Sequence, residues 1–280
     1  MQDYDDFMIK VPMVKVNTKE LRVVSYEDTI IKEDRVSLYL NGTKIISTMC
    51  ILNDQDAHAV GFLMSEGVIE NIEDIYNIEV SKDGLSVFIN AKINDENIAN
   101  LFHEKTLTSG CCVGVSANFE GKIIQKFLSQ KVRFHLKEIE QYLLKFQKDT
   151  ELFYLTGCVH KAMLFCGNQV FSSEDIGRHN ALDKVIGKAK LAKVDTSTAL
   201  LIVSGRLSME MVIKCAMHDI PIVVSNAATT ALGIQSAQNL GITLVGFAKN
   251  GYMNIYTHKS RIILPCDIQN DYEVLSRLES

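Results

Sequence analysis

Three uninterrupted apolar runs in the second half of the chain constrain its fold most. They cover residues 199–203, 221–225 and 243–247. Helix-like segments at 208–218 and 230–240 separate them. Continuous β-branched runs are typical of strands buried on both faces, and strands alternating with helices are typical of a parallel sheet. The pattern predicts a mainly parallel sheet with helices on both sides, and Asn250-Gly251 predicts an antiparallel edge hairpin.

The first part of the chain has a mixed pattern instead. Strand-like runs at 36–40 and 44–50 flank Asn41-Gly42, which is a strong hairpin dipeptide. A second hairpin is expected over 75–91, and a helix over 95–105.

A helix around 57–64, capped by Asn53 or Asp54, is also expected in this part. Helical spacing begins again at Leu136. We therefore expect an α/β protein with an N-terminal α+β domain over 1–135 and an αβα domain over 136–280.

Composition and charge exclude several classes of protein. The 280 residues are 47% apolar and 22% charged, which excludes wholesale disorder. A net charge of −5 argues against a dedicated nucleic-acid binder, although a local basic site for an anion is compatible with it. No apolar run is long enough to span a bilayer, and the acidic start differs from a secretory signal. We expect a cytoplasmic protein without membrane contact, in which the seven cysteines are free thiols, catalytic groups or metal ligands.

The best candidate for chemistry is the loop at 108–114, in which Gly110 and Gly114 flank the adjacent thiols Cys111 and Cys112. Glycine allows unusual backbone conformations, and a nucleophilic cysteine must be accessible and partly ionised. The alternative is a pair of buried cysteines beside a turn. Adjacent cysteines do not have the spacing of a zinc site.

A second candidate begins the helix expected from residue 178. His179 and Asp183 are four residues apart and so share one helix face, where the carboxylate would orient the imidazole. Asn180 and Lys184 form a neighbouring polar stripe, and Arg178 lies at the helix N-terminus, which favours anions. The alternative is a solvated face with a surface ion pair.

Three loops follow the three predicted parallel strands. Ligands of open α/β sheets bind beyond the carboxyl ends of the strands, so these loops are expected to converge. They carry Arg206, Thr229, Thr230 and Lys249. Each loop alone reads equally as a helix cap or a hairpin turn, but together they predict a nucleotide or phosphate pocket.

Several familiar motifs are absent from the sequence. There is no P-loop, no G-x-G-x-x-G fingerprint and no zinc-deaminase signature. Cys50, Cys166 and Cys215 lie in apolar patterns and are expected in the core. Cys158 and His160 are less clear, and His160 is expected to be a core histidine.

Several long motifs, in order, resemble the FdhD-type formate dehydrogenase accessory sulfurtransferases of the FdhD/NarQ family. They are Thr156-Gly-Cys-Val-His160, Glu174-Asp-Ile-Gly-Arg-His-Asn-Ala-Leu-Asp-Lys184, Ser204-Gly-Arg-Leu-Ser-Met-Glu-Met211, Ala227-Ala-Thr-Thr230 and Gly241 through His258. The resemblance implies a homodimer that takes persulfide sulfur from a cysteine desulfurase. It implies transfer of that sulfur to the molybdenum or tungsten bis(guanine dinucleotide) cofactor of formate dehydrogenase. It also implies a cytidine-deaminase-like carboxy-terminal domain without zinc.

The resemblance carries over to particular residues. Cys111 matches the first cysteine of the family's CxxC loop and would bear the persulfide, whereas Gly114 stands where the second cysteine is expected. The stretch that matches the family's cofactor-binding segment is Phe247, Ala248, Lys249, Asn250, Gly251 and Tyr252. We expect a sulfurtransferase with Cys111 as its catalytic residue, and the cofactor held also by Arg206, Thr229, Thr230, Arg178 and His179. The alternative, favoured by the altered loop, is a non-catalytic chaperone that binds and delivers the cofactor.

Overall fold

The computed structural model describes residues 5–94, 97–98, 106–107, 113–114, 126–129, 131–148 and 151–265. Contacts divide the chain into two compact units. Unit 1 comprises Met1–Asn118, Thr150–Ala162 and Phe171–Val194, and unit 2 comprises Phe119–Asp149, Met163–Val170 and Asp195–Ser280. This grouping differs from a single boundary at residue 135, because the helix that begins at Arg178 packs within unit 1.

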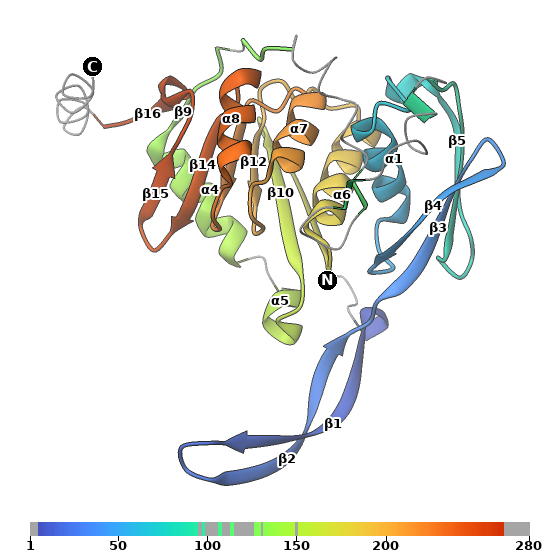
Figure 1. The fold of residues 1–280 in the computed structure, drawn as a ribbon, viewed down its shortest axis with the longest axis vertical. Coiled ribbons are helices and arrows are strands. Elements are labelled where there is room, and N and C mark those ends of the chain that lie inside the picture. The colour runs from blue at the N-terminus through green and yellow to red at the C-terminus, as the bar shows by residue number, and fades with distance from the viewer. Residues whose placement is uncertain are drawn as a thin grey trace. The chain divides into compact units, whose positions relative to one another are not determined.

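A four-stranded sheet organises unit 1 (Figure 1). Its strands are β3 (Asp34–Leu40), β4 (Thr43–Cys50), β5 (Ile75–Val80) and β6 (Ser86–Ala91), in the order β4-β3-β6-β5. Both expected hairpins form. Asn41 and Gly42 turn between β3 and β4 with φ of 48° and 80°, the left-handed conformation that a tight hairpin requires. β3 and β6 pair in parallel.

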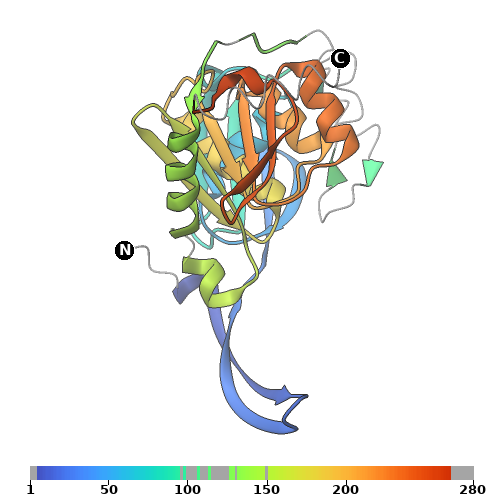
Figure 2. The ribbon, with the colours of Figure 1, turned by 90° about the vertical axis from the view of Figure 1, so that its left-hand side faces the viewer.

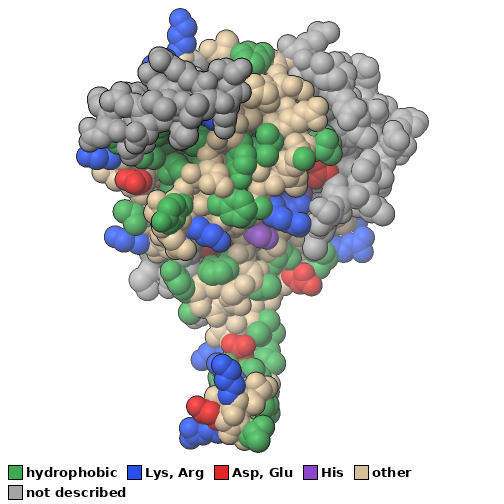
Figure 3. Space-filling model, turned by 60° about the vertical axis from the view of Figure 1, so that its left-hand side comes forward, with side chains coloured by type: hydrophobic (Ala, Val, Ile, Leu, Met, Phe, Trp, Pro, Cys, Tyr) green, Lys and Arg blue, Asp and Glu red, His purple; other side chains and the backbone are tan. Residues whose placement is uncertain are grey.

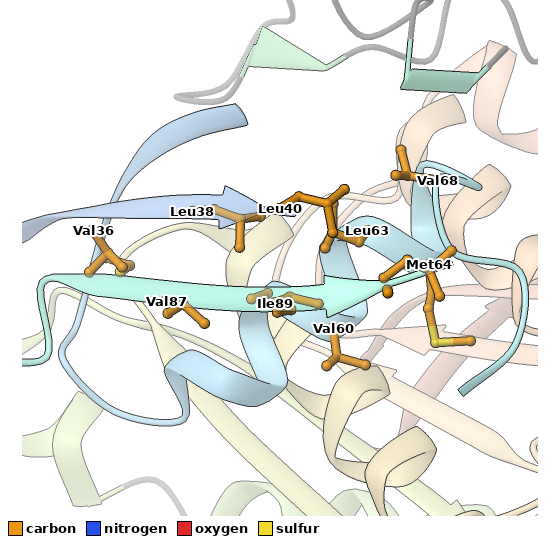
Figure 4. Close-up of a cluster of buried hydrophobic side chains, with 13 residues drawn as sticks. Val36, Leu38, Leu40, Val60, Leu63, Met64, Val68, Val87 and Ile89 are labelled. Atoms are coloured by element: carbon orange, nitrogen blue, oxygen red, sulfur yellow. The ribbon is translucent and has the colours of Figure 1, made fainter. Parts of the chain in front are cut away.

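Helix α1 (Gln55–Ser65) covers one face of this sheet. The expected helix is therefore confirmed, with Asp54 at its N-cap, although the Asp54 side chain makes no capping hydrogen bond. Val60, Leu63 and Met64 pack against alternate residues of β3 and β6, as Figure 4 shows. This alternation of buried and exposed side chains gives unit 1 its main core.

Helix α6 (Arg178–Leu191) packs against α1 within the same unit. The two helices approach closely at two glycines. A Cβ atom on Gly61 would lie 1.9 Å from the Asp183 carbonyl oxygen, and one on Gly187 would lie 1.8 Å from that of Ala57. Each glycine thus makes room for the backbone of the other helix.

A long N-terminal hairpin, which the sequence patterns did not predict, also belongs to unit 1. It follows the short 3-10 helix η1 (Asp5–Phe7) and pairs β1 (Met8–Asn17) with β2 (Arg22–Ile31) over ten residues. Its base joins a small core through Ile31, which packs with Ile51, Leu152 and Val159 beside α5 (Glu151–Thr156). Most of its remaining residues are exposed.

Unit 2 is built on a six-stranded sheet of order β11-β10-β12-β13-β14-β15. The strands are β10 (His160–Cys166), β11 (Gln169–Asp175), β12 (Leu200–Val203), β13 (Ile222–Ser225), β14 (Thr243–Lys249) and β15 (Tyr252–Ile255), with β10 and β11 contributing their 163–170 portion to the unit. β12, β13 and β14 pair in parallel, and β15 pairs antiparallel with β14. The expected parallel strands and edge hairpin are confirmed.

Helices cover both faces of these strands. On one face, α4 (Leu136–Lys148) packs Ile139, Leu143 and Phe146 against alternate strand residues, and Figure 2 shows it along the sheet. On the other face lie α7 (Met209–Met217) and α8 (Ala231–Leu240), which also contact each other (Figure 1). Burial on both faces explains why β12, β13 and the first part of β14 are mostly apolar.

The remaining elements are short. They are η2 (Ile72–Asp74), β7 (Thr106–Leu107), β8 (Val113–Gly114), β9 (Phe134–His135), η4 (Lys259–Arg261) and β16 (Ile262–Ile263). β9 and β16 pair in parallel. Most of the helix expected over 95–105 lies outside the described residues. Among the described helices, none has the length and apolar character that crossing a membrane requires.

Candidate binding site at the strand ends of unit 2

The loops that follow β12 and β13 are hydrogen-bonded to each other. The Leu207 amide donates to the Ala228 carbonyl, and the Thr230 amide donates to the Leu207 carbonyl, both at 3.0 Å. Buried Ser225 adds a third link, because its hydroxyl donates to the Gly205 carbonyl at 2.7 Å. The two loops therefore form one continuous surface beyond the carboxyl ends of parallel strands.

The end of β14 joins the same surface. The Phe247 amide donates to the Ala227 carbonyl at 3.0 Å, and a β-bulge between Gly246 and Lys249 turns the strand there. A Cβ atom on Gly246 would lie 3.1 Å from Thr229 Cγ2 and 3.3 Å from the Ala227 carbonyl oxygen, so glycine permits this close approach. The prediction that the three loops converge is confirmed.

Two exposed aromatic residues lie in the hairpin of β14 and β15. Phe247 has a φ of 52°, which is uncommon for a bulky residue, and its side chain is 40% exposed. Tyr252, across the hairpin turn, is 79% exposed. Exposed aromatic side chains at a strand end provide faces on which a planar base can stack.

The three loops also carry polar and basic residues. Arg206, Thr230, Lys249, Asn250 and Gly251 are exposed, and Thr229 is half-buried. Ala248 was predicted to contact the cofactor. Its side chain is fully buried in the core of unit 2, so only its backbone could make that contact.

Two helices begin at this surface. α7 follows Ser208, whose Oγ is buried and has no hydrogen-bond partner among the described residues. α8 follows Thr230, whose Oγ1 caps the helix by accepting the Gly233 amide at 3.0 Å. Helix N-termini carry free N–H groups and a partial positive charge, which favour phosphate. With Arg206 and Lys249, this surface has the groups needed to bind an anionic, base-containing ligand.

The expected polar stripe of the motif at 174–184, Asn180 and Lys184, is buried inside unit 1. Lys184 and Asp175 are both completely buried and form an ion pair of 2.6 Å. Lys184 Nζ also donates to the Asn53 side chain at 2.6 Å and to the Ile51 carbonyl at 3.0 Å. The expected polar stripe is therefore neither a solvated helix face nor a binding surface. It forms a buried network of hydrogen bonds within unit 1, which we call the brace.

Asn180 and Asp183 complete this brace. Asn180 donates to Asp175 at 2.8 Å and to the Met49 carbonyl at 2.9 Å. Asp183 accepts a hydrogen bond from Ser65 at 2.9 Å. Side chains of α6 thereby hold the segment after β4 and the end of α1. Sequence reasoning missed this network because polar side chains in a helix are normally solvated.

Arg178 and His179 begin α6, as predicted. His179 is 6% exposed and Arg178 is half-buried. Both belong to unit 1, whereas the other predicted binding residues belong to unit 2.

The described cysteines differ sharply in accessibility. Cys50, Cys166 and Cys215 are buried, as predicted, and Cys158 is exposed. Burial raises the pKa of the Cys50 thiol from its ordinary value of 9.0 to about 12, which the nearby Lys184 charge only partly opposes. Cys111 and Cys112 lie outside the described residues, between the paired strands β7 and β8. No metal-binding cluster of His, Cys, Asp and Glu occurs among the described residues.

Fold and site together define an α/β protein with a surface of basic, polar and aromatic residues at the carboxyl ends of parallel strands. The FdhD/NarQ family model matches residues 31–263. The chain is 55% identical to the sulfur carrier protein FdhD of Wolinella succinogenes over 94% of this chain and 92% of that protein. It is 32% identical to the sulfur carrier protein FdhD of Bacillus subtilis over 84% of this chain and 91% of that protein.

A solved structure has the same fold. It is described as a formate dehydrogenase accessory protein from Desulfotalea psychrophila, and it aligns with a TM-score of 0.75 over 92% of this chain and all of that chain, at 24% identity. The chain belongs to the FdhD/NarQ family.

Proposed function

We propose that this chain is a sulfur carrier for formate dehydrogenase. In this proposal Cys111 accepts sulfur from a cysteine desulfurase and passes it to the bis(guanine dinucleotide) cofactor of the dehydrogenase. The observation that carries the proposal is the strand-end surface of unit 2, in which three hydrogen-bonded loops present Arg206, Phe247 and two helix N-termini. The names of the relatives in Wolinella succinogenes and Bacillus subtilis support the sulfur-transfer part.

The surface suits a guanine dinucleotide as substrate. A guanine base offers a flat face for Phe247 or Tyr252, both of which are exposed. Its pyrophosphate offers charge for Arg206 and Lys249, and oxygen atoms for the N-terminal amides of α7. The Ser208 hydroxyl, which lacks a partner among the described residues, would gain one from a bound phosphate.

The sulfur chemistry is thiol exchange. The Cys111 thiolate attacks the terminal sulfur of the donor's persulfide, so a new S–S bond forms on Cys111 while the donor cysteine leaves as a thiolate. In a second transfer the S–S bond of the Cys111 persulfide would break and the terminal sulfur would bind the metal of the bound cofactor as sulfide. The two electrons for this reduction would come from the reduced metal of that substrate, and Cys111 would leave as a thiolate. Gly114 replaces the second cysteine of the family loop, so this path uses one thiol only.

Intact-protein mass spectrometry after incubation with a cysteine desulfurase and cysteine tests the carrier role. Wild type should gain about 32 Da, the mass of one sulfur atom, and Cys111→Ala should not. Cys112→Ala and Cys158→Ala are the matched controls, the latter because Cys158 is an exposed thiol. An adduct that persists in Cys111→Ala would refute the assignment.

A non-catalytic cofactor chaperone is the second candidate, and Gly114 at the position of the resolving cysteine is the observation that favours it. Wild type without a sulfur adduct but with intact binding of GDP would establish this alternative. The same proposal includes a homodimer and a cytidine-deaminase-like carboxy-terminal half, which the mixed sheet of unit 2 and its lack of zinc-ligand motifs support.

A further inference from the structure

The β1–β2 hairpin exposes apolar side chains on both faces. Directly opposed residues share a face, so Ile9 and Ile30 lie on one side and Val16 and Val23 on the other. Val16 is 55% exposed and Val23 is 63% exposed. Figure 3 shows hydrophobic side chains along this ribbon, interspersed with charged ones. A two-stranded ribbon is marginally stable in water on its own, so exposure of this kind indicates an interaction surface.

The hydrogen bonds at the base show which backbone groups face outward. The Lys32 amide donates to the Phe7 carbonyl at 2.8 Å, so residues 7 and 32 form a hydrogen-bonded pair. Hydrogen-bonded and non-hydrogen-bonded pairs alternate along an antiparallel ladder. In the printed register, the even-numbered residues of β1 and the odd-numbered residues of β2 therefore direct their N–H and C=O groups away from the hairpin.

The two outer edges differ in their capacity to accept another strand. On β1, Pro12 occupies an outward-facing position and has no N–H group. Proline on an edge strand blocks further pairing. On β2, residues 23, 25, 27 and 29 all have N–H groups, of which that of Thr29 donates to the Asp28 side chain at 3.0 Å. The β2 edge is therefore the open one.

We propose that the open edge of β2 pairs antiparallel with β2 of a second copy of this chain, around a two-fold axis at Ser25. The product is a four-stranded ribbon of order β1-β2-β2-β1. Outward-facing Ser25 of each copy would form a hydrogen-bonded pair, as would Val23 with Glu27 of the other copy.

Charge and side-chain complementarity select this register. It places Arg22 opposite Asp28 of the second copy, twice, and Val24 opposite Tyr26 of the second copy, also twice. Opposite charges and aromatic–β-branched pairs both stabilise cross-strand neighbours. Neither Arg22 nor Asp28 forms an ion pair with another residue that the structure describes. No like charges face each other in this register.

This inference rests on the homodimer in the proposed function and gives that homodimer an interface. It is independent of the sulfur chemistry, because mass spectrometry reports on Cys111 whether or not the chains pair.

A matched pair of proline variants provides the first test. Ser25→Pro removes an outward N–H from β2, and Val14→Pro removes one from β1 directly opposite, so neither change breaks a hydrogen bond between β1 and β2. Analytical ultracentrifugation of the full chain should show a dimer for wild type and Val14→Pro. For Ser25→Pro, the dissociation constant should rise by at least roughly tenfold, equivalent to about 1.4 kcal/mol.

Cysteine cross-linking provides the second test, which does not depend on how well the proline variants fold. Ser25→Cys should form a disulfide-linked dimer under mild oxidation, because the Cα atoms of a hydrogen-bonded pair are about 5.5 Å apart. Thr29→Cys, on the same edge, should not, because the register separates the two copies of that residue by eight positions. The wild-type chain, oxidised in the same way, is the control for disulfide cross-links that form through the native cysteines.

Charge exchange provides the third test. Arg22→Asp should weaken the dimer, and adding Asp28→Arg should restore it. A monomeric wild type at micromolar concentration would overturn the proposal. Unchanged dimerisation of Ser25→Pro would also overturn it. If both proline variants dissociate, the cross-link decides: linkage at Ser25→Cys supports the interface, and its absence overturns it.

Discussion

At the scale of single residues, we expect the buried ion pair between Lys184 and Asp175 to make a large contribution to the stability of unit 1. Replacing Lys184 by Met keeps much of the side-chain volume but leaves a buried carboxylate without its cation. Loss of one partner from a buried pair destabilises a protein by about 3–5 kcal/mol. We expect a decrease of that size in the free energy of unfolding, measured by urea denaturation.

The same helix offers the control. Lys188 pairs with Asp54 at 2.6 Å, but its side chain is 28% exposed, so Lys188→Met should cost only about 1 kcal/mol. Adding Asp175→Asn to Lys184→Met removes the unpaired charge and should recover part of the stability. Equal effects at positions 184 and 188 would contradict this account of the brace.

Cys50 makes stability fall in alkaline solution. Burial holds the pKa of its thiol at about 12 in the folded chain, against an ordinary value of 9.0, so only the unfolded chain loses this proton between those values. The unfolded state then binds fewer protons, and the free energy of unfolding decreases as pH rises, by up to about 1.4 kcal/mol per pH unit.

Chemical denaturation between pH 9 and 12 measures that slope. Cys50→Ala should flatten it, even though the variant is less stable at neutral pH because it leaves a small cavity. An identical slope in wild type and variant would show that other groups cause the decrease.

At the scale of elements, the crossing of α1 and α6 depends on two glycines. Glycine to alanine in the interior of a helix normally stabilises by about 1 kcal/mol. Here the added Cβ would overlap a carbonyl of the facing helix, at 1.9 Å for Gly61 and 1.8 Å for Gly187. We expect Gly61→Ala and Gly187→Ala each to destabilise by several kcal/mol, measured by urea denaturation.

Gln235→Ala, at an exposed position of α8, is the control for helix propensity and should change stability by only about 0.5 kcal/mol. A Gly61→Ala variant as stable as wild type would mean that the helices can separate without loss.

Helices and strands could be predicted from the sequence where their apolar residues pack into a core, because burial then produces a regular apolar pattern. Val36, Leu38 and Leu40 alternate inward along β3, and the three apolar runs of unit 2 are buried on both faces. β1 and β2 were missed because their apolar residues lie on both faces and cover no core. Alternation, which is the usual sign of a strand, is therefore weak there.

The site was predictable to the extent that topology determines it. Parallel strands bring the loops at 204–208 and 226–230 to one edge, as their hydrogen bonds show. The burial of Lys184 and Asn180 was not predictable, because it depends on Met49, Ile51 and Asn53, more than 100 positions earlier in the chain. The sequence around Lys184 and Asn180 contains no sign of these distant hydrogen-bond partners.

At the scale of the whole molecule, the strand-end surface should determine affinity for the substrate. Arg206→Ala should weaken binding of GDP by roughly tenfold, because a charge-assisted contact to phosphate contributes about 1.5–3 kcal/mol and Arg206 is partly screened by solvent. Calorimetric titration measures the loss, which should shrink as salt increases.

Lys137→Ala removes an exposed positive charge from α4, on the opposite face of the sheet of unit 2, and should leave GDP affinity unchanged. Equal losses for the two variants would mean that net charge, rather than the site, attracts the nucleotide.

The N-terminal hairpin is synthesised well before some of the residues that pack against its base. Its base is held in part by Leu152 and Val159, and Val159 lies 128 positions after Ile31 in the chain. At about 5–20 residues per second, the ribosome needs on the order of ten seconds to deliver those residues. Throughout that interval the nascent chain exposes the apolar residues of β1 and β2 without Leu152 and Val159. Nascent chains on neighbouring ribosomes of one messenger would bring such ribbons together, so the first contact between copies can precede the completion of either fold.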